Sequence, residues 1–165
     1  MKIKKIKYCH PALRRKAKKV DDSNEISGLI KEMKRILKEE EGVGLAAPQV
    51  GVSKRVIVIN AAEDQMMALL NPEIIKKSRE KIVGREGCLS MKGVWLDIER
   101  YKEVKIKFLD EEGKQLEIDA DGLLAVVLQH EIDHLDGKLF IDRVGFLRKM
   151  KAIFSYFFLK DERAY

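Results

Sequence analysis

Hydrophobic residues recur at helical spacing near both ends of the chain. Between residues 26 and 37 they fall three and four positions apart, which predicts a helix with one buried face. Asp22 or Ser23, just before this segment, has a side chain suited to an N-cap. Residues 145–160 carry apolar side chains at similar intervals, so we expect another helix there.

A third helical segment, residues 122–135, is apolar almost all round its first half. A helix of this kind usually lies at the centre of a core. Asp121 stands at the N-cap position and Gly137 follows the last turn, so both ends of the helix are marked.

Strands are predicted where apolar residues alternate or where β-branched residues cluster. The predicted strands are 55–60, 68–71, 73–77, 94–99, 103–109 and 115–119, the last two forming a hairpin. Pro72 is expected to separate the second strand from the third, because proline cannot donate to a strand ladder. The sequence therefore predicts an α+β fold, with antiparallel sheets packed around the buried helix 122–135 and a C-terminal helix.

The remaining segments are expected to be short or irregular. Ile3, Ile6 and Tyr8 resemble a strand, followed by a helical turn that begins at Pro11. The stretches 42–51 and 84–90 are rich in glycine and are expected to have no regular structure.

Composition excludes two broad classes of protein. The chain has 165 residues, 45% hydrophobic and 36% charged, which argues against a disordered chain or a membrane protein. No linker or repeat divides it, so we expect one domain over residues 1–165. The net charge of +6 is compatible with an anionic partner such as RNA but does not require one.

Two cysteines, Cys9 and Cys88, are too few for a disulfide framework and indicate thiols in a reducing compartment. The basic N-terminus lacks the apolar run of a secretory signal. We therefore expect a cytoplasmic protein that does not span a membrane.

The buried helix carries the pattern HExxH as His130, Glu131 and His134. Residues four apart lie on one helix face, so two imidazoles can hold one metal ion with a carboxylate beside it. The chain has three histidines, and two of them at this spacing favour a metal site over a solvated helix face.

The residues alone leave the third metal ligand open. The position at which metzincin-like proteases place a third histidine is Phe140, which excludes that arrangement. The acidic residues after the motif are not well placed for a thermolysin-like site. Cys88 is a candidate, but a free cysteine is just as often an inert buried residue.

Three segments together resemble the signature motifs of the peptide deformylase family: Gly42–Gln49 (GVGLAAPQ), Glu86–Ser90 (EGCLS) and Gln129–His134 (QHEIDH). They occur in the family's order and at typical separations, within a resemblance that covers roughly residues 8–145. The resemblance implies an enzyme that removes the N-formyl group from the initiator methionine of new polypeptides and releases formate.

The resemblance also implies the ligand set. Cys88, His130 and His134 match the family's metal ligands, which hold one divalent ion. That ion is typically Fe²⁺ in the cell, and Zn²⁺, Ni²⁺ or Co²⁺ can occupy the site in preparations. Its open position would turn a water into hydroxide, which would attack the formyl carbon.

Three further residues match catalytic positions of the family. Glu131 would take the proton of the water and pass it to the leaving amine. The side-chain amide of Gln49 and the backbone N–H of Leu89 would donate to the developing oxyanion. Without the resemblance, Gln49 would be read as a loop amide that caps nearby backbone.

An apolar pocket for the methionine side chain is implied as well. By resemblance, the residues at or near the substrate are Val43, Gly44, Gly87, Leu123, Val126 and Val127. Two residues depart from the usual pattern: Lys92 replaces a common proline, and Trp95 stands where a substrate-contacting side chain often lies. We expect Trp95 to pack on the sheet, although it could instead form a flat wall for later substrate residues.

The expected partner is the N-formylmethionyl nascent peptide. The basic, aromatic C-terminal helix could dock on the domain, form a dimer or contact the ribosome, and the sequence does not rank the last two.

Two other functions compete with deformylation. An HExxH peptidase of another kind predicts a third ligand other than cysteine, and an RNA- or ribosome-binding protein predicts a closed structural metal site.

Overall fold

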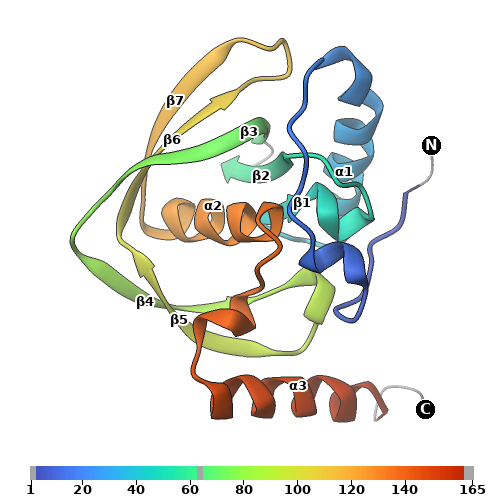
Figure 1. The fold of residues 1–165 in the computed structure, drawn as a ribbon, viewed down its shortest axis with the longest axis vertical. Coiled ribbons are helices and arrows are strands. Elements are labelled where there is room, and N and C mark those ends of the chain that lie inside the picture. Colours follow the sequence, from blue (N-terminus) through green and yellow to red (C-terminus); the bar gives the residue numbers. More distant parts are fainter. Residues whose placement is uncertain (1–2, 63–64, 162–165) are drawn as a thin grey trace.

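Two antiparallel sheets enclose one helix in this α+β fold (Figure 1). The computed structural model describes residues 3–62 and 65–161. The larger sheet has the order β1-β2-β3-β6-β7 and the smaller one pairs β4 with β5. The strands are β1 (Gly44–Ala46), β2 (Val56–Ala62), β3 (Gln65–Lys77), β4 (Lys81–Gly87), β5 (Trp95–Tyr101), β6 (Glu103–Leu109) and β7 (Gln115–Asp121).

Three α-helices accompany the sheets: α1 (Ser27–Glu39), α2 (Gly122–Leu135) and α3 (Phe146–Asp161). Helix α2 lies between the two sheets, as the sequence predicts, and α3 lies outside the smaller one (Figure 1). Short 3₁₀ turns occupy Pro11–Arg14, Asn24–Ile26, Ala47–Val50, Leu89–Met91 and Phe140–Arg143. No helix in the described part of the chain is long and apolar enough to cross a membrane.

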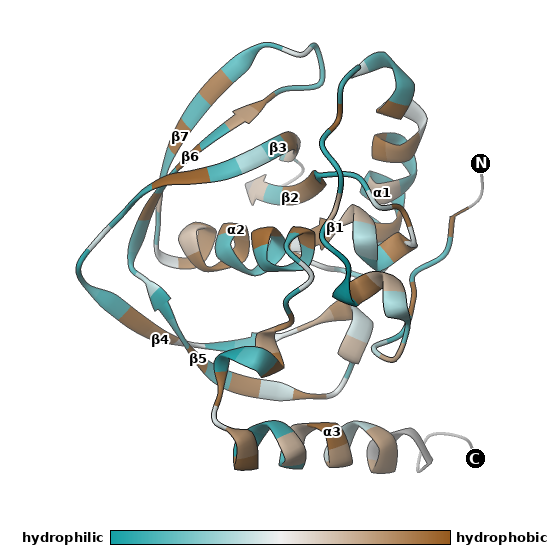
Figure 2. Ribbon diagram, viewed as in Figure 1, coloured by the Kyte–Doolittle hydropathy of each residue, from teal (hydrophilic) through white to brown (hydrophobic). Residues whose placement is uncertain are grey.

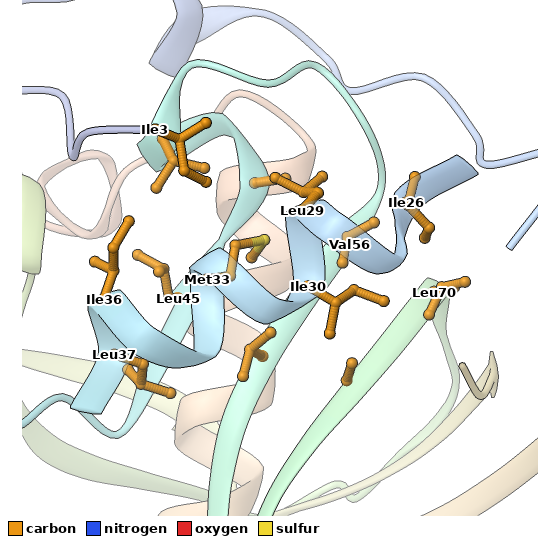
Figure 3. Packing of buried hydrophobic residues seen from close by; sticks show 14 of the residues in the cluster. Ile3, Ile26, Leu29, Ile30, Met33, Ile36, Leu37, Leu45, Val56 and Leu70 are labelled. Carbon is orange, nitrogen blue, oxygen red and sulfur yellow. The ribbon is translucent and has the colours of Figure 1, made fainter. Parts of the chain in front are cut away.

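The helix α1 buries the face that its spacing predicts. Leu29, Met33 and Leu37 are almost fully covered, and they pack with Val56 and Leu70 of the larger sheet (Figure 3). A second cluster joins α2 to the same sheet. Strand β2 contributes to both clusters, since Val56 and Val58 pack with α1 whereas Ile57 and Ile59 pack with α2. The two helices therefore cover opposite faces of the sheet.

Pro72 does not break a strand, which corrects the prediction of two short ones. The strand β3 pairs with β2 up to Leu70 and with β6 onward from that residue, and the register shifts between Leu70 and Glu73. Pro72 lies in this irregularity, where a ladder N–H is not needed. Asn71 adopts a φ of 51° beside it and exchanges two 2.8 Å hydrogen bonds with the backbone of Val20.

Two other predictions of secondary structure are wrong. Residues 84–87 form the end of β4, paired with β5, although glycines frame them. The arm from Ile3 to Tyr8 forms no strand, since its amides bond to separate loops: Ile6 donates to the carbonyl of Gln49 and Tyr8 to that of Ser90. The turn that begins at Pro11 is confirmed.

The predicted caps are only half right. Asp121 occupies the N-cap position of α2, but its side chain makes no capping bond. Ser23 precedes only a short 3₁₀ turn, and its side chain makes no capping hydrogen bond. The side chain of Asp22 accepts a hydrogen bond from the backbone amide of Asn24 at 2.8 Å. The helix α1 therefore starts at Ser27, a turn later than these signals imply.

Asp142 ties three parts of the chain together below α2. Its carboxylate accepts the amide of Leu139 at 2.9 Å and the Lys149 ammonium at 2.6 Å, and it also pairs with Arg14. Burial opposes ionisation, but these three donors together hold the pKa of Asp142 below its ordinary value.

The substitution Asp142→Asn should therefore cost about 1 kcal/mol of stability at pH 7. Because the folded-state pKa is depressed, the contribution is present above the ordinary pKa of 3.8 and is lost as the pH falls through the lower folded value. Urea unfolding of both proteins between pH 7 and pH 2.5 would measure this. A difference that stays constant below pH 4 would contradict it.

Candidate metal centre and active-site cleft

Three metal-ligating side chains converge where β4 ends against α2. Cys88 follows β4, and His130 and His134 project from one face of α2; all three are buried. Their ligand atoms lie within 4.8 Å of one another, and Cys88 Sγ is 3.3 Å from His134 Nε2. Among the described residues this is the group with metal-ligand geometry.

The donor set fits a divalent transition metal. Tetrahedral bonds of typical length place a sulfur and a nitrogen ligand about 3.6 Å apart, close to the spacing found here. Burial lowers the pKa of His134 well below its ordinary value, so its imidazole is neutral and able to coordinate. A thiolate with two imidazoles is a set that iron, zinc, nickel and cobalt all accept.

Glu86 orients one of the ligands. Its carboxylate lies 2.8 Å from Nδ1 of His130, which leaves Nε2 of that ring to face the cysteine. Burial alone would raise the pKa of Glu86, but hydrogen bonds from Arg100 and His130 lower it to about 2. The carboxylate is therefore ionised and fixes the proton of His130 on Nδ1.

Arg100 joins this shell to the helix. Its guanidinium donates to both oxygens of Glu86, at 2.7 and 3.0 Å, and to Asp133 of α2 at 2.6 Å. Arg143 donates to Asp133 from the opposite side at 2.9 Å. Arg100, Glu86 and Asp133 are all buried, so β4, β5 and α2 share one network of charges.

Sequence reasoning assigned no role to Arg100, Glu86 or Asp133. The signal lay in β5, where buried and exposed positions alternate and Arg100 falls on the inward set with Ile98. An arginine at an inward strand position indicates a buried carboxylate partner nearby.

A cavity of about 470 Å³ opens beside the ligands. Glu131 is buried at its base, and its Oε2 has no hydrogen-bond partner within the described structure. Burial raises the pKa of Glu131 to about 7. A Cβ at Gly44 would lie 2.6 Å from Oε1 of Glu131, so a glycine there lets the carboxylate reach the cavity.

Gln49 and Leu89 lie on the same cavity. The side-chain oxygen Oε1 of Gln49 accepts a hydrogen bond from the backbone amide of Ala46 at 2.8 Å. This bond turns Nε2 of Gln49 toward Cys88 Sγ, 3.5 Å away. Leu89 begins the 3₁₀ turn after the cysteine, where backbone N–H groups lack partners within the turn. Both the predicted catalytic role and the plain capping role of Gln49 thus have a geometric basis.

The structure brings all the predicted substrate residues to this cavity, which is lined by Val43, Gly44, Gly87, Leu123, Val126 and Val127 among others. Val126 and Val127 are buried, whereas Val43 and Leu123 are 51% and 70% exposed at its mouth. Two of the acidic residues that follow the motif are engaged elsewhere: Asp136 pairs with Arg55 at 2.7 Å, and Asp142 pairs with Arg14 and Lys149.

Trp95 is more exposed than expected for a residue packed on the sheet. One part of its ring covers Gly87, where a Cβ would lie 3.0 Å from ring atoms. The side chain is nevertheless 57% exposed and borders the cavity, so it forms part of the cavity wall. Lys92, at the same rim, pairs with Glu40 at the end of α1.

Comparison with known proteins matches residues 3–150 to the family described as polypeptide deformylase. Peptide deformylase of Natranaerobius thermophilus is 48% identical over 87% of this chain and 93% of its own length. That of Hydrogenovibrio crunogenus is 44% identical over 92% and 91%.

Solved structures agree with this match. A peptide deformylase from Legionella pneumophila superposes with a TM-score of 0.92 at 38% identity, covering 98% of this chain and 97% of that one. A peptide deformylase from Synechococcus elongatus in complex with actinonin gives 0.88 at 39%, covering 93% and 86%. The fold and sequence thus define a hydrolytic enzyme of a metal-dependent class. The chain belongs to the polypeptide deformylase family, as its three motifs predict.

We expect the substitution Arg100→Met to destabilise the fold by about 3–5 kcal/mol, because it leaves Glu86 and Asp133 buried without their shared cation. Urea unfolding of the metal-loaded protein would measure the loss. Lys102→Met is the matched control: Lys102 pairs with exposed Glu80 at 3.0 Å on the same hairpin, and its removal should cost less than about 1 kcal/mol. Equal losses in the two variants would contradict this account of the network.

Proposed function

We propose that this enzyme hydrolyses the N-formyl group of N-formylmethionyl polypeptides soon after synthesis and releases formate. The observation that carries the proposal is the position of Glu131, whose free carboxylate oxygen lies at the base of an apolar cavity beside three convergent metal ligands. The site thus unites three metal-ligating side chains, a carboxylate that can carry a proton and a recess with an apolar lining.

Cys88, His130 and His134 would hold the metal, and we propose Fe²⁺ as the ion in the cell. When bound, such an ion supplies Lewis-acid activation of a water molecule. Zn²⁺, Ni²⁺ and Co²⁺ suit the same donors and can replace it in preparations. Glu86 and Arg100 keep the ring of His130 in the orientation that coordination needs.

Glu131 would move the proton. Its Oε2 has no hydrogen-bond partner among the described residues, so it can accept the proton of the attacking water at that atom and release it to the departing amine. A side chain at position 44 would collide with Oε1 of Glu131, so Gly44 leaves the carboxylate the room it needs.

Two donors would stabilise the negative charge that develops on the formyl oxygen. Gln49 presents Nε2 to the ligand side of the cavity because its oxygen is held by Ala46. The N–H of Leu89 would be the second donor, across the cysteine from Gln49.

The substrate backbone would bind between two open strand edges. Among the strands of the described chain, β1, which carries Gly44, pairs with β2 alone, and β4, which ends at Gly87, pairs with β5 alone. Both glycines line the cavity, so an extended peptide could add to either edge. Val126 and Val127 would contact the methionine side chain, with Val43 and Leu123 at the mouth.

We also propose that the protein works in the cytoplasm, on chains leaving the ribosome. A direct ribosome contact through α3 stays a prediction. Two basic residues of that helix are turned to the domain: Arg148 donates to the carbonyl of Asp97 at 3.3 Å and Lys149 to Asp142 at 2.6 Å.

Formate release from formyl-Met-Ala-Ser by anaerobically purified protein, loaded with Fe²⁺ or Ni²⁺, tests the proposed function directly. We expect rapid metal-dependent release of formate and no release of acetate from the acetylated peptide, since close packing around the formyl carbon would exclude the additional methyl group. Cleavage of unformylated peptides at an internal bond would instead favour a peptidase.

Metal removal should lower the melting temperature by about 5–10 °C, because an ion at a hundred times its dissociation constant adds about 2.7 kcal/mol. Reloading with Ni²⁺ should restore it. The variant Cys88→Ala should lose this response, while Cys9→Ala should keep it because Cys9 is exposed and does not belong to the ligand group. A response that survives in Cys88→Ala would remove Cys88 from the ligand set.

Replacing Glu131 with Gln should reduce kcat by about a hundred- to ten-thousandfold, since the proton carrier is lost. Metal content, measured by elemental analysis, should remain at one ion per chain. Glu112→Gln, a change of the same kind in the exposed β6–β7 loop, should leave both quantities unchanged. Full activity in Glu131→Gln would show that another group moves the proton.

A further inference from the structure

Helix α3 is apolar on two faces, and the domain covers only one of them. Ala152 and Tyr156 are buried, and the Tyr156 ring meets that of Tyr8 edge-on with centroids 5.6 Å apart. Large apolar side chains on the remaining surface are between 46% and 81% exposed: Phe146, Leu147, Met150, Phe154, Phe157 and Phe158. Because the apolar faces of helices are normally buried, the exposed second face of α3 is unusual.

This outer face of α3, defined by those six side chains, is large for an isolated protein. At about 200 Å² for a fully exposed side chain of this size, the six together expose roughly 700 Å². The largest apolar patch of a typical monomer is about 300–600 Å². Figure 2 shows the hydrophobic residues along α3, at the outside of the molecule beyond the smaller sheet.

The spacing along the outer face is that of a helix–helix seam. Leu147, Met150, Phe154 and Phe157 follow one another at intervals of three, four and three residues, the repeat by which two helices interlock side chains. Phe154 and Phe158 already pack ring to ring with centroids 3.9 Å apart, so part of the surface is ordered before any partner arrives.

Charge favours a protein partner over an anionic membrane. An amphipathic helix that binds lipid needs basic side chains free to reach the head groups. In α3, Arg148 and Lys149 instead bond to Asp97 and Asp142 of the domain. Lys151 lies in the hollow between α3 and β5, beside Trp95. These cations are therefore directed away from the outer face.

We propose that the outer face of α3 pairs with the same face of a second copy of this chain, about a two-fold axis. Such an interface uses one surface twice and closes on itself. Two copies would together cover roughly 1,400 Å², within the range of about 1,200–2,000 Å² for specific stable interfaces. The aromatic side chains at its centre are of the type that dominates interface energies. This inference does not depend on the proposed catalytic activity.

Sedimentation equilibrium of the metal-loaded full chain, from about 1 to 100 µM, tests the pairing. We expect a species of twice the monomer mass of 19.0 kDa. The double substitution Leu147→Glu and Phe154→Glu should raise the dimer dissociation constant by roughly a hundredfold or more. Both side chains are exposed, so circular dichroism and melting temperature should show a folded monomer.

The matched control places two glutamates on exposed aliphatic positions elsewhere. Ile75→Glu with Val83→Glu, at side chains 45% and 69% exposed on β3 and β4, should leave the dimer intact. If the double variant on α3 does not fold, Met150→Glu alone provides the same test.

Three outcomes would overturn the inference. The first is a wild-type protein that stays monomeric at 100 µM. The second is a dimer that the substitutions on α3 do not weaken, or that the control weakens equally, because its interface then lies elsewhere. The third is a monomer that co-sediments with vesicles of phosphatidylglycerol and phosphatidylcholine, which would make lipid the occupant of the outer face.

Discussion

The buried guanidinium of Arg100 is the interaction on which the arrangement of the site depends. A charge inside a protein is stable only when its partners are close and its hydrogen bonds are complete. Arg100 meets this condition with two carboxylates, Glu86 from β4 and Asp133 from α2. Because these belong to different elements, neutralising the arginine also fixes the small sheet against the helix.

The same network also controls the protonation of a metal ligand. Glu86 stays ionised because Arg100 and His130 both donate to it, and its acceptance of the Nδ1 proton leaves the other ring nitrogen of His130 free. Cys88 lies two residues beyond Glu86, so the strand that positions the carboxylate also delivers the thiol. The fold therefore couples the placement of two ligands to one salt-bridge cluster.

Local sequence signals were sufficient where an element is long and its burial is simple. Helix α2 begins and ends at the predicted residues because its apolar run and its flanking residues agree. Pro72 misled the prediction, since β3 changes its partner strand at that point and thereby tolerates a residue without an N–H. The glycines around β4 misled it too, because pairing with β5 across seven residues outweighs their weak strand preference.

The residues of the candidate site also differ in how far the sequence alone predicts them. The histidine pair and Glu131 follow from helical spacing, whereas Cys88 needed the family resemblance and Arg100 offered only an inward position in an alternating strand. Its partners are 14 and 33 residues away in the chain, and only the packed structure brings them together. Burial of charge is a tertiary property, and a single sequence contains it only as an unexplained inward-facing residue.

The strand edges of β1 and β4 at the cavity bear on the range of substrates that the enzyme can accept. Open edges usually invite aggregation, because any extended chain can pair with them. Here Gly44 and Gly87 line the cavity, so the two edges border a recess and not an open face of the molecule. Recognition through backbone amides and carbonyls, common to every polypeptide, would leave one apolar side chain to be selected. An enzyme that recognises its substrate in this way can act on many different proteins, because binding does not depend on the sequence after the first residue.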